Sequence, residues 1–180
     1  MKKVLAIIDM QNDFLTGALG NAECEATIDE VVKIIQNGDY ERVIITYDTH
    51  APEYLTTQEG RKLPVEHCIK GTDGWQINDR VMAAIRAKFE PLKWLIFEKG
   101  TFGSKELGSR MEEIYGDGRD LTVDFAGVCT GICVISNATV LKAFCPEAEI
   151  NILAKGCACV TPNSHEIALE QMKMLHMNIL

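Results

Sequence analysis

The sequence has no apolar run of the roughly 20 residues that a membrane-spanning helix needs. It also has no excess of basic residues: 18 Lys and Arg stand against 26 Asp and Glu, a formal net charge of -8. Nucleic acids and anionic membranes bind basic patches, so we expect neither as a partner. The opening residues MKKVLAIIDMQ lack the longer apolar region and the cleavage site of a signal peptide. We therefore expect a cytoplasmic protein.

Internal repeats, low-complexity tracts and an interdomain linker are absent as well. A chain of 180 residues, 47% hydrophobic and 24% charged, suits one globular domain with a sizeable core. We therefore expect a single domain over residues 1–180.

Seven cysteines are present, which is an odd number. Structural disulfides are rare in a reducing cytoplasm, so we expect most of these thiols to be buried as small hydrophobic residues. Cys157 and Cys159 are interpreted in this way. Cys129 and Cys133 are four residues apart, which is not the spacing of a structural zinc site. Packing or a chemical reaction remains as their role.

Apolar, strand-like runs alternate with helix-like segments along the chain. This alternation predicts a parallel sheet covered by helices on both faces. The predicted strands are 3–9, 42–48, 93–99, 120–127 and 149–155, and the predicted helices are 23–38, 75–89, 104–115, 131–144 and 162–176. Thr161 and Pro162 provide the N-cap and first position of the last helix. The polar segment 49–74 is longer than ordinary connections, which is typical of a functional loop.

Reactive side chains follow the strands at the edge where parallel sheets bind ligands. Asp9 ends the first strand, Asp48 ends the second with His50 two residues later, and Lys99 ends the third. The segment GVCTGICV (127–134) leaves the fourth strand. Each acid alone could cap a turn, and the lysine alone could be a solvated strand end. Their presence together at one edge favours a site.

Cys133 is the candidate nucleophile of this edge. Thr130 is a suitable N-cap for a helix from Gly131, which would place Cys133 in the first turn, where the helix dipole stabilises a thiolate. Backbone N–H groups around Cys129 and Cys133 could face a developing oxyanion. Asp9 can accept the thiol proton if burial raises its pKa. A packing role for Cys133 remains the alternative.

The histidines have other expected roles. His165 and His176 lie in the predicted last helix and are interpreted as solvent-facing. Asp48, His50 and His67 form a two-imidazole, one-carboxylate set that suits Zn²⁺, Fe²⁺ or Mn²⁺. The same set could indicate a non-haem iron oxygenase, but that function would leave Cys133 unused.

Five segments resemble the isochorismatase-like cysteine hydrolases, and within them most closely the metal-containing nicotinamidases. They are AIIDMQNDF (6–14), TYDTH (46–50), PVEHCIKGT (64–72), FEKGTFGS (97–104) and GVCTGICV (127–134). The resemblance implies a three-layer α/β/α fold with a doubly wound, six-stranded, mainly parallel sheet. It also implies a homo-oligomer, a dimer or larger.

The resemblance further implies roles for individual residues. Asp9, Lys99 and Cys133 would form the catalytic triad. The peptide bond between Val128 and Cys129 would be cis, and the N–H groups of Cys129 and Cys133 would form the oxyanion hole.

The metal of such relatives would fall on Asp48, His50 and His67, with zinc preferred over iron or manganese. Nicotinamidases often carry Trp-Pro before the loop histidine, whereas this chain has Leu63-Pro64 and then Val-Glu. We therefore expect Phe14 or Trp75 to provide an aromatic wall for the substrate.

The expected reaction is hydrolysis of a small, nicotinamide-like carboxamide to an acid and ammonia through a thioester. The alternatives are an isochorismatase-like or ureido-acid hydrolase, and a binding module that has kept the fold without catalysis.

Overall fold

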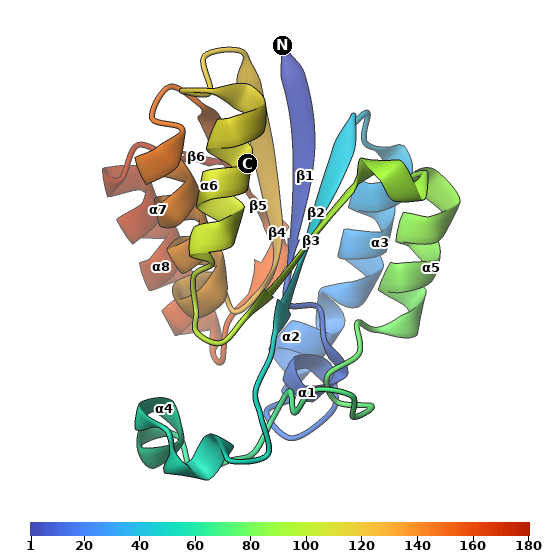
Figure 1. Ribbon diagram of the computed structural model, residues 1–180, viewed down its shortest axis with the longest axis vertical. Helices are drawn as coiled ribbons and strands as arrows, with labels where there is room; N and C mark the ends of the chain where they lie inside the picture. Colours follow the sequence, from blue (N-terminus) through green and yellow to red (C-terminus); the bar gives the residue numbers. More distant parts are fainter.

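The computed structural model describes all 180 residues and is built on one six-stranded sheet (Figure 1). The strand order is β3-β2-β1-β4-β5-β6, and every neighbouring pair is parallel. The strands are β1 Lys2–Ile8, β2 Arg42–Asp48, β3 Trp94–Lys99, β4 Leu121–Val128, β5 Glu149–Ala158 and β6 Asn178–Ile179. The predicted α/β fold class is confirmed.

Helices cover both faces of this sheet (Figure 1). α6, α7 and α8 pack on one face, and α3 and α5 pack on the other. The helices are α1 Asn12–Leu15, α2 Ala22–Ala26, α3 Ile28–Asn37, α4 Gln58–Lys62, α5 Asp79–Lys88, α6 Lys105–Tyr115, α7 Ile135–Phe144 and α8 Pro162–Met174. None of them is long and apolar enough to cross a membrane.

The sequence of β1 is a continuous apolar run because this central strand is covered by helices on both faces of the sheet. Val4, Ala6 and Ile8 pack beneath α6, α7 and α8. Leu5 and Ile7 point to the opposite face and pack beneath α3 and α5. All five are fully buried, so neither face of the strand tolerates a polar residue.

Several element boundaries differ from the sequence prediction. β5 continues to Ala158, because after a register shift its pairing with β4 resumes between Gly127 and Cys157. α5 begins at Asp79, where the Asn78 side chain caps it, and not at residue 75. α8 ends at Met174, so His176 lies beyond the last helix. The predicted cap of α8 is confirmed, since the Thr161 hydroxyl accepts from the Ser164 N–H and Pro162 follows.

The segment between β2 and α5 lies beyond the carboxyl ends of the strands. It contains the 3-10 turn η1, Tyr54–Thr56, and the short helix α4 (Figure 1). Two isolated bridges anchor it, His50 with Ile69 and Gln11 with Ile77. Through these anchors the segment is held over the edge where the reactive side chains were predicted.

Candidate active site and metal centre

Three predicted site residues meet at the carboxyl ends of β1, β3 and β4. Asp9 follows β1, Lys99 ends β3, and Cys133 lies in the turn after β4. Their exposed fractions are 0%, 3% and 5%. Lys99 Nζ is 2.7 Å from Asp9 Oδ2 and 3.6 Å from Cys133 Sγ. The Lys99 ammonium therefore contacts both the carboxylate and the thiol away from bulk water.

Thr46 fixes the orientation of the Asp9 carboxylate. The Thr46 hydroxyl donates to Asp9 Oδ1 at 2.6 Å and is 3.1 Å from the Asp9 N–H. Oδ2 has no conventional hydrogen bond and makes only the ion pair with Lys99. Burial raises the pKa of Asp9, and Lys99 opposes this effect. Within the protein, Oδ2 is therefore held by the Lys99 ammonium alone.

Lys99 remains charged in this buried position. Burial alone would lower its pKa, but the charges of Asp9, Cys133 and Asp48 raise the pKa above its ordinary value. Asp48 Oδ1 lies 3.5 Å from Lys99 Nζ, so this ammonium contacts both carboxylates. The charge of Lys99 therefore balances a site that otherwise collects negative groups.

The surroundings of Cys133 raise the pKa of its thiol. Burial raises its pKa, Asp9 raises it further, and Lys99 only partly opposes the increase. A thiol with a raised pKa needs a neighbouring base to become a nucleophile.

The turn that carries Cys133 differs from the prediction. Residues Thr130–Val134 form one π-helical turn, with Cys129 in the extended N-cap position and no side-chain cap. The hydroxyl of Thr130 instead lies 2.8 Å from His165 Nδ1. Thr130 is thus not an N-cap, and His165 is not simply solvent-facing, because the two side chains pair with each other. π turns of this kind occur frequently at functional sites.

The peptide bond between Val128 and Cys129 is cis, as the family resemblance implied. The N–H of Cys129 donates to no protein acceptor. Gly127 makes the close approach of β4 to β1 possible, since a Cβ at this position would lie 2.1 Å from the carbonyl oxygen of Ile8. A free backbone donor is therefore held close to the Cys133 turn.

Asn137 holds this turn to the loop after β3, a role that the sequence did not indicate. Its Nδ2 donates to the carbonyl of Cys133 at 2.8 Å and to that of Phe102 at 2.9 Å. Its Oδ1 accepts from the Ser104 N–H at 3.0 Å. Asn137 is fully buried, so it fixes Phe102 in position relative to Cys133.

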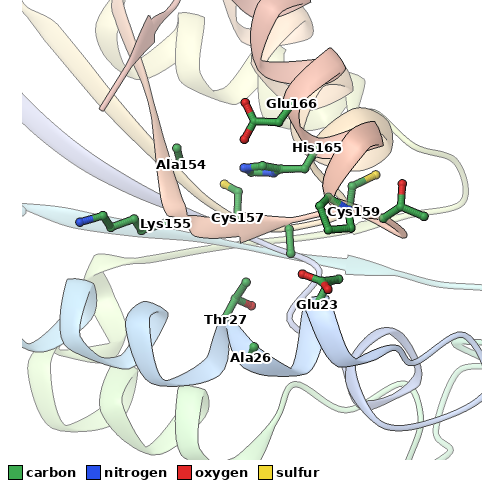
Figure 2. A pocket seen from close by; sticks show the side chains of 12 residues that line it. Glu23, Ala26, Thr27, Ala154, Lys155, Cys157, Cys159, His165 and Glu166 are labelled. Atoms are coloured by element: carbon green, nitrogen blue, oxygen red, sulfur yellow. The ribbon is translucent and has the colours of Figure 1, made fainter.

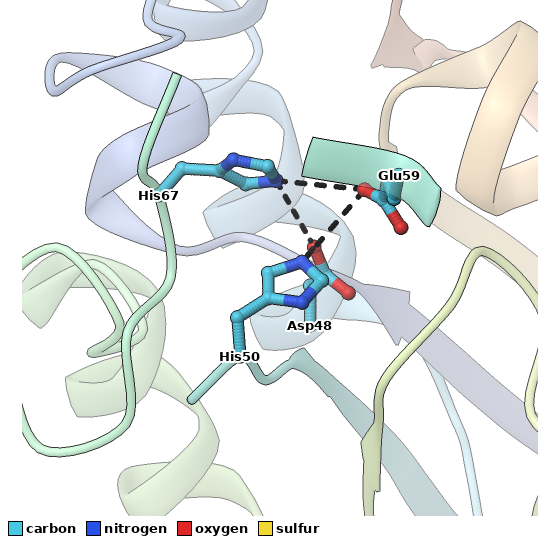
Figure 3. A group of neighbouring side chains, drawn as sticks. All are labelled: Asp48, His50, Glu59 and His67. Carbon is cyan, nitrogen blue, oxygen red and sulfur yellow. Dashed lines mark hydrogen bonds and ion pairs between the residues drawn. The ribbon is translucent and has the colours of Figure 1, made fainter. Parts of the chain in front are cut away.

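A second cluster lies beside these residues and contains the three predicted metal ligands and Glu59 (Figure 3). Asp48 Oδ2 is 3.0 Å from His50 Nε2 and 3.5 Å from His67 Nε2. Glu59 Oε1 is 3.8 Å from the first of these nitrogens and 3.9 Å from the second. All four ligand atoms lie within 4.8 Å of one another, which suits a divalent ion bound at about 2.0–2.2 Å.

The environment of the cluster prepares it for a cation. His67 Nδ1 bonds to the carbonyl of Val65 at 2.8 Å, which leaves Nε2 facing the centre. Gln11 fixes Asp48, because its amide bonds to both the N–H and the carbonyl of that residue, at 2.7 and 2.8 Å. Burial and the neighbouring Asp48 charge raise the pKa of Glu59. This donor set fits a metal ion such as Zn²⁺ and forms a candidate metal site.

Glu59 was not predicted, because it lies on α4 and shares no sequence spacing with the other ligands. The helix brings it over the cluster from the opposite side (Figure 3). The only indication in the sequence that Glu59 belongs to the site was its position inside the long segment 49–74, which was expected to be functional.

An apolar cavity of about 320 Å³ connects Cys133 and the metal cluster. Its apolar lining comprises Phe14, Leu19, Leu63, Phe102, Ile132 and Val160, and Cys129, Cys133, Asp48, Glu59 and His67 complete it. The rings of Phe14 and His67 are 5.6 Å apart between centroids. Phe14 therefore forms part of the cavity wall beside His67.

Trp75 does not line this cavity. Its Nε1 donates to the Thr49 hydroxyl at 2.9 Å, and its ring packs 5.0 Å from that of Tyr47. Its carbonyl accepts from Gln11 Nε2, which supports the residue that fixes Asp48. The predicted role of Trp75 as a substrate wall is therefore wrong, because the segment 75–78 pairs with Gln11 instead of starting a helix.

The sheet is open and parallel, and its reactive side chains and apolar cavity lie at the carboxyl ends of the strands. The protein therefore belongs to the class of open α/β proteins that bind ligands at this edge. Residues 3–179 match the family described as the isochorismatase domain. The chain therefore belongs to the isochorismatase family of hydrolases, as its motifs predicted.

Relatives within the family have been characterised to different degrees. An isochorismatase family protein, PncA, of Bacillus subtilis is 31% identical over 176 residues, which cover 94% of this chain and 93% of the relative. The crystal structure of nicotinamidase/pyrazinamidase PncA from Bacillus subtilis has a TM-score of 0.82 at 28% identity and covers 99% of both chains. The nicotinamidase of Saccharomyces cerevisiae is 28% identical over 142 residues, 63% of each chain.

Proposed function

We propose that this chain hydrolyses a small, uncharged carboxamide of the nicotinamide type to its acid and ammonia. The observation that carries the proposal is the buried Lys99 ammonium, which contacts both the Cys133 thiol and the Asp9 carboxylate at the base of an apolar cavity. The similarity to relatives described as nicotinamidases supports the amide as the substrate class.

In the proposed reaction, Asp9 Oδ2 takes the proton of Cys133 while Lys99 stabilises the thiolate. The sulfur bonds to the carbonyl carbon, and the N–H groups of Cys129 and Cys133 stabilise the oxyanion. Asp9 returns the proton to the amide nitrogen, the C–N bond breaks, and ammonia leaves. A water molecule that gives a proton to Asp9 then cleaves the thioester, which releases the acid and restores the thiol.

Asp48, His50, Glu59 and His67 would hold a divalent metal ion, with Zn²⁺ the best match and Fe²⁺ or Mn²⁺ also compatible with the donors. Such an ion supplies Lewis-acid polarisation and orientation of a bound group. The apolar side chains of the cavity exclude bulk water, and Phe14 packs against the ring of the substrate.

The cavity lining disfavours the other hydrolase substrates. Isochorismate-like compounds and ureido acids carry carboxylates, which proteins usually bind with Arg or Lys. No Arg or Lys lines the cavity. Lys99 beneath it is paired with Asp9 and Asp48 and is not free to bind an anion.

The two remaining alternatives leave part of the site without a role. An iron oxygenase would use the metal cluster but not the contact of Cys133 with Asp9 and Lys99. A binding module would need neither the buried thiol nor the free Asp9 oxygen.

The test is ammonia release from nicotinamide by the metal-loaded protein, with and without a chelator. We expect Cys133→Ala to lower turnover by about 1,000-fold or more while the fold survives. Cys145→Ala removes a buried thiol from the core instead and should keep activity. Near-normal turnover by Cys133→Ala would overturn the nucleophile, and hydrolysis of a ureido acid in place of neutral amides would overturn the substrate class.

A further inference from the structure

The short helix α1 carries a carboxylate that bonds to the segment with the metal ligands. Asp13 Oδ2 accepts from the Cys68 N–H at 2.7 Å, although the two residues are 55 positions apart in the chain. Asp13 Oδ1 accepts from the Ala18 N–H at 3.2 Å. Gly74 leaves the space for this carboxylate, since a Cβ at that position would lie 2.2 Å from Oδ2. Neither Asp13 nor Cys68 has a role in the proposed hydrolysis.

Cys68 is the residue that links the two imidazole ligands of the metal cluster. It directly follows His67 in the chain, and its carbonyl accepts from the His50 N–H at 3.0 Å. The carbonyl of His50 in turn accepts from the Lys70 N–H at 2.9 Å. A shift of the Cys68 backbone would therefore move His67 directly and His50 through its N–H group.

The backbone of Cys68 has a conformation that needs support from outside its own segment. Its φ of +48° lies in the left-handed region, which residues with a Cβ adopt rarely. Cys68 is fully buried, and the Asp13 carboxylate is the only protein acceptor of its N–H. Hydrogen bonds to an ionised carboxylate are stronger than bonds between neutral groups. The Asp13 side chain therefore stabilises the turn that directs His67 at the cluster.

Backbone hydrogen bonds hold α1 to the same segment independently of the Asp13 side chain. The Asp13 N–H donates to the carbonyl of Gly74 at 2.9 Å, and the Asn12 N–H donates to that of Gln76 at 2.9 Å. Both bonds remain when the side chain of Asp13 is shortened. A substitution at Asp13 should therefore release Cys68 locally while α1 stays attached to the segment.

We infer that Asp13 is a positioning residue of the metal centre, which holds His67 and His50 in the arrangement that binds a divalent ion. It acts through the Cys68 N–H and touches neither imidazole in this role. The inference rests on the proposed metal site. Groups that fix the direct ligands of a metal typically contribute about 10- to 100-fold to its affinity, so we expect loss of this carboxylate to weaken binding by about tenfold or more.

A second cavity, of about 270 Å³, also contains a histidine and carboxylates and is the place where an added metal ion could bind without Asp13 (Figure 2). His165, Glu23 and Glu166 line it. Their ligand atoms do not come together as those of the cluster in Figure 3 do. His165 Nδ1 instead pairs with the Thr130 hydroxyl. His165→Ala therefore reports whether an ion has bound in this cavity.

The experiment titrates the metal-free protein with Co²⁺, whose visible absorption reports the geometry of its ligands, and measures Zn²⁺ affinity by competition with a chromophoric chelator. The wild type should bind one Co²⁺ ion, His67→Ala should lose it, and His165→Ala should keep it. Asp13→Ala should bind Zn²⁺ about tenfold or more weakly and change the Co²⁺ spectrum. Asp73→Ala, the matched control, removes an exposed carboxylate from the same segment and should behave as the wild type.

Asp13→Asn separates the two hydrogen bonds of the carboxylate. Its amide oxygen can still accept from the Cys68 N–H, whereas its NH₂ group cannot accept from the Ala18 N–H, so we expect a Zn²⁺ affinity within about threefold of the wild type. Asp13→Ser is too short to reach Cys68 and takes the place of Asp13→Ala if the alanine variant does not fold. An affinity of Asp13→Asn as low as that of Asp13→Ala would mean that the bond to Cys68 is not the cause.

Equal Zn²⁺ affinities and Co²⁺ spectra of Asp13→Ala and the wild type would overturn the inference and leave the metal site in place. Weaker binding with an unchanged Co²⁺ spectrum would also overturn it, because a misplaced imidazole must alter the geometry of the ligands. A wild type that binds no Co²⁺ would overturn the metal site and the inference together. None of these measurements uses an amide substrate, so the proposed hydrolysis is tested separately.

Discussion

Cys133 and Cys159 occupy equivalent places in the fold but have opposite environments. Each follows a strand of the sheet, β4 or β5, and lies where the chain enters a helix, α7 or α8. Asp9 and Asp48 lie close to Cys133, and its pKa is raised. Backbone and hydroxyl donors surround Cys159, and its pKa is lowered. The two strand-to-helix connections therefore shift the pKa values of their cysteines in opposite directions.

The difference shows that a helix start does not by itself activate a cysteine. From the sequence, Cys133 is predicted to lie in the first turn of a helix, where the helix dipole would stabilise its thiolate. The structure has a π turn there, and the local charge comes from carboxylates and Lys99. In the proposed reaction, activation of Cys133 depends on transfer of its proton to Asp9.

The largest expected effect tests the base beside Cys133. Asp9→Asn keeps the shape but removes the proton acceptor, so we expect turnover to fall about 1,000-fold. The loss of one negative charge should also lower the pKa of Cys133, which makes its alkylation by iodoacetamide faster. Steady-state kinetics and peptide mapping measure the two effects. Loss of turnover together with slower alkylation would mean that Asp9 holds the structure rather than the proton.

The second prediction compares how the alkylation rates of Cys133 and Cys159 change with pH. Between about pH 6.5 and 8.5 the alkylation rate of Cys133 should rise about 100-fold, since its thiolate fraction grows about tenfold per pH unit below its pKa. The rate at Cys159, with a pKa of about 5, should stay nearly constant over the same interval. Timed alkylation with peptide mapping gives both rates. Parallel slopes for the two residues would remove the contrast between their environments.

The smallest expected effect concerns the link between the two regions, the pair of Thr130 and His165. Thr130→Val keeps the shape of the side chain and removes the hydrogen bond, so the free energy of unfolding should fall by about 1 kcal/mol. Urea denaturation measures it, with the exposed Thr101→Val as the matched control. An equal effect in both variants would mean that this pair does not couple the start of α8 to the Cys133 turn.

The parts of the site that could be predicted from the sequence are the side chains at the end of a strand or directly after it. Apolar runs that end in Asp9, Asp48 and Lys99 were sufficient, because parallel strands bring their ends to one edge. The two residues of β6 are too few to show a period, and only the family resemblance implied a sixth strand.

Contacts made through tertiary structure could not be predicted. The partner of Thr130 lies 35 residues away, and Glu59 reaches the metal cluster from a separate short helix. Trp75 was misassigned because its carbonyl accepts from Gln11, 64 residues away. In each case the deciding interaction joins side chains or backbone groups that no local pattern relates.

The amide of Asn137 has a consequence for how this site can change during evolution. Because it bonds to the carbonyls of both Phe102 and Cys133, one wall of the cavity and the proposed nucleophile are held together. Substitutions that reshape the wall at Phe102 will therefore disturb the rate as well as the fit. Leu63, at the end of α4, has no such connection to Cys133. New substrate preferences should arise more readily at Leu63, where the pocket can vary while the reacting thiol stays in place.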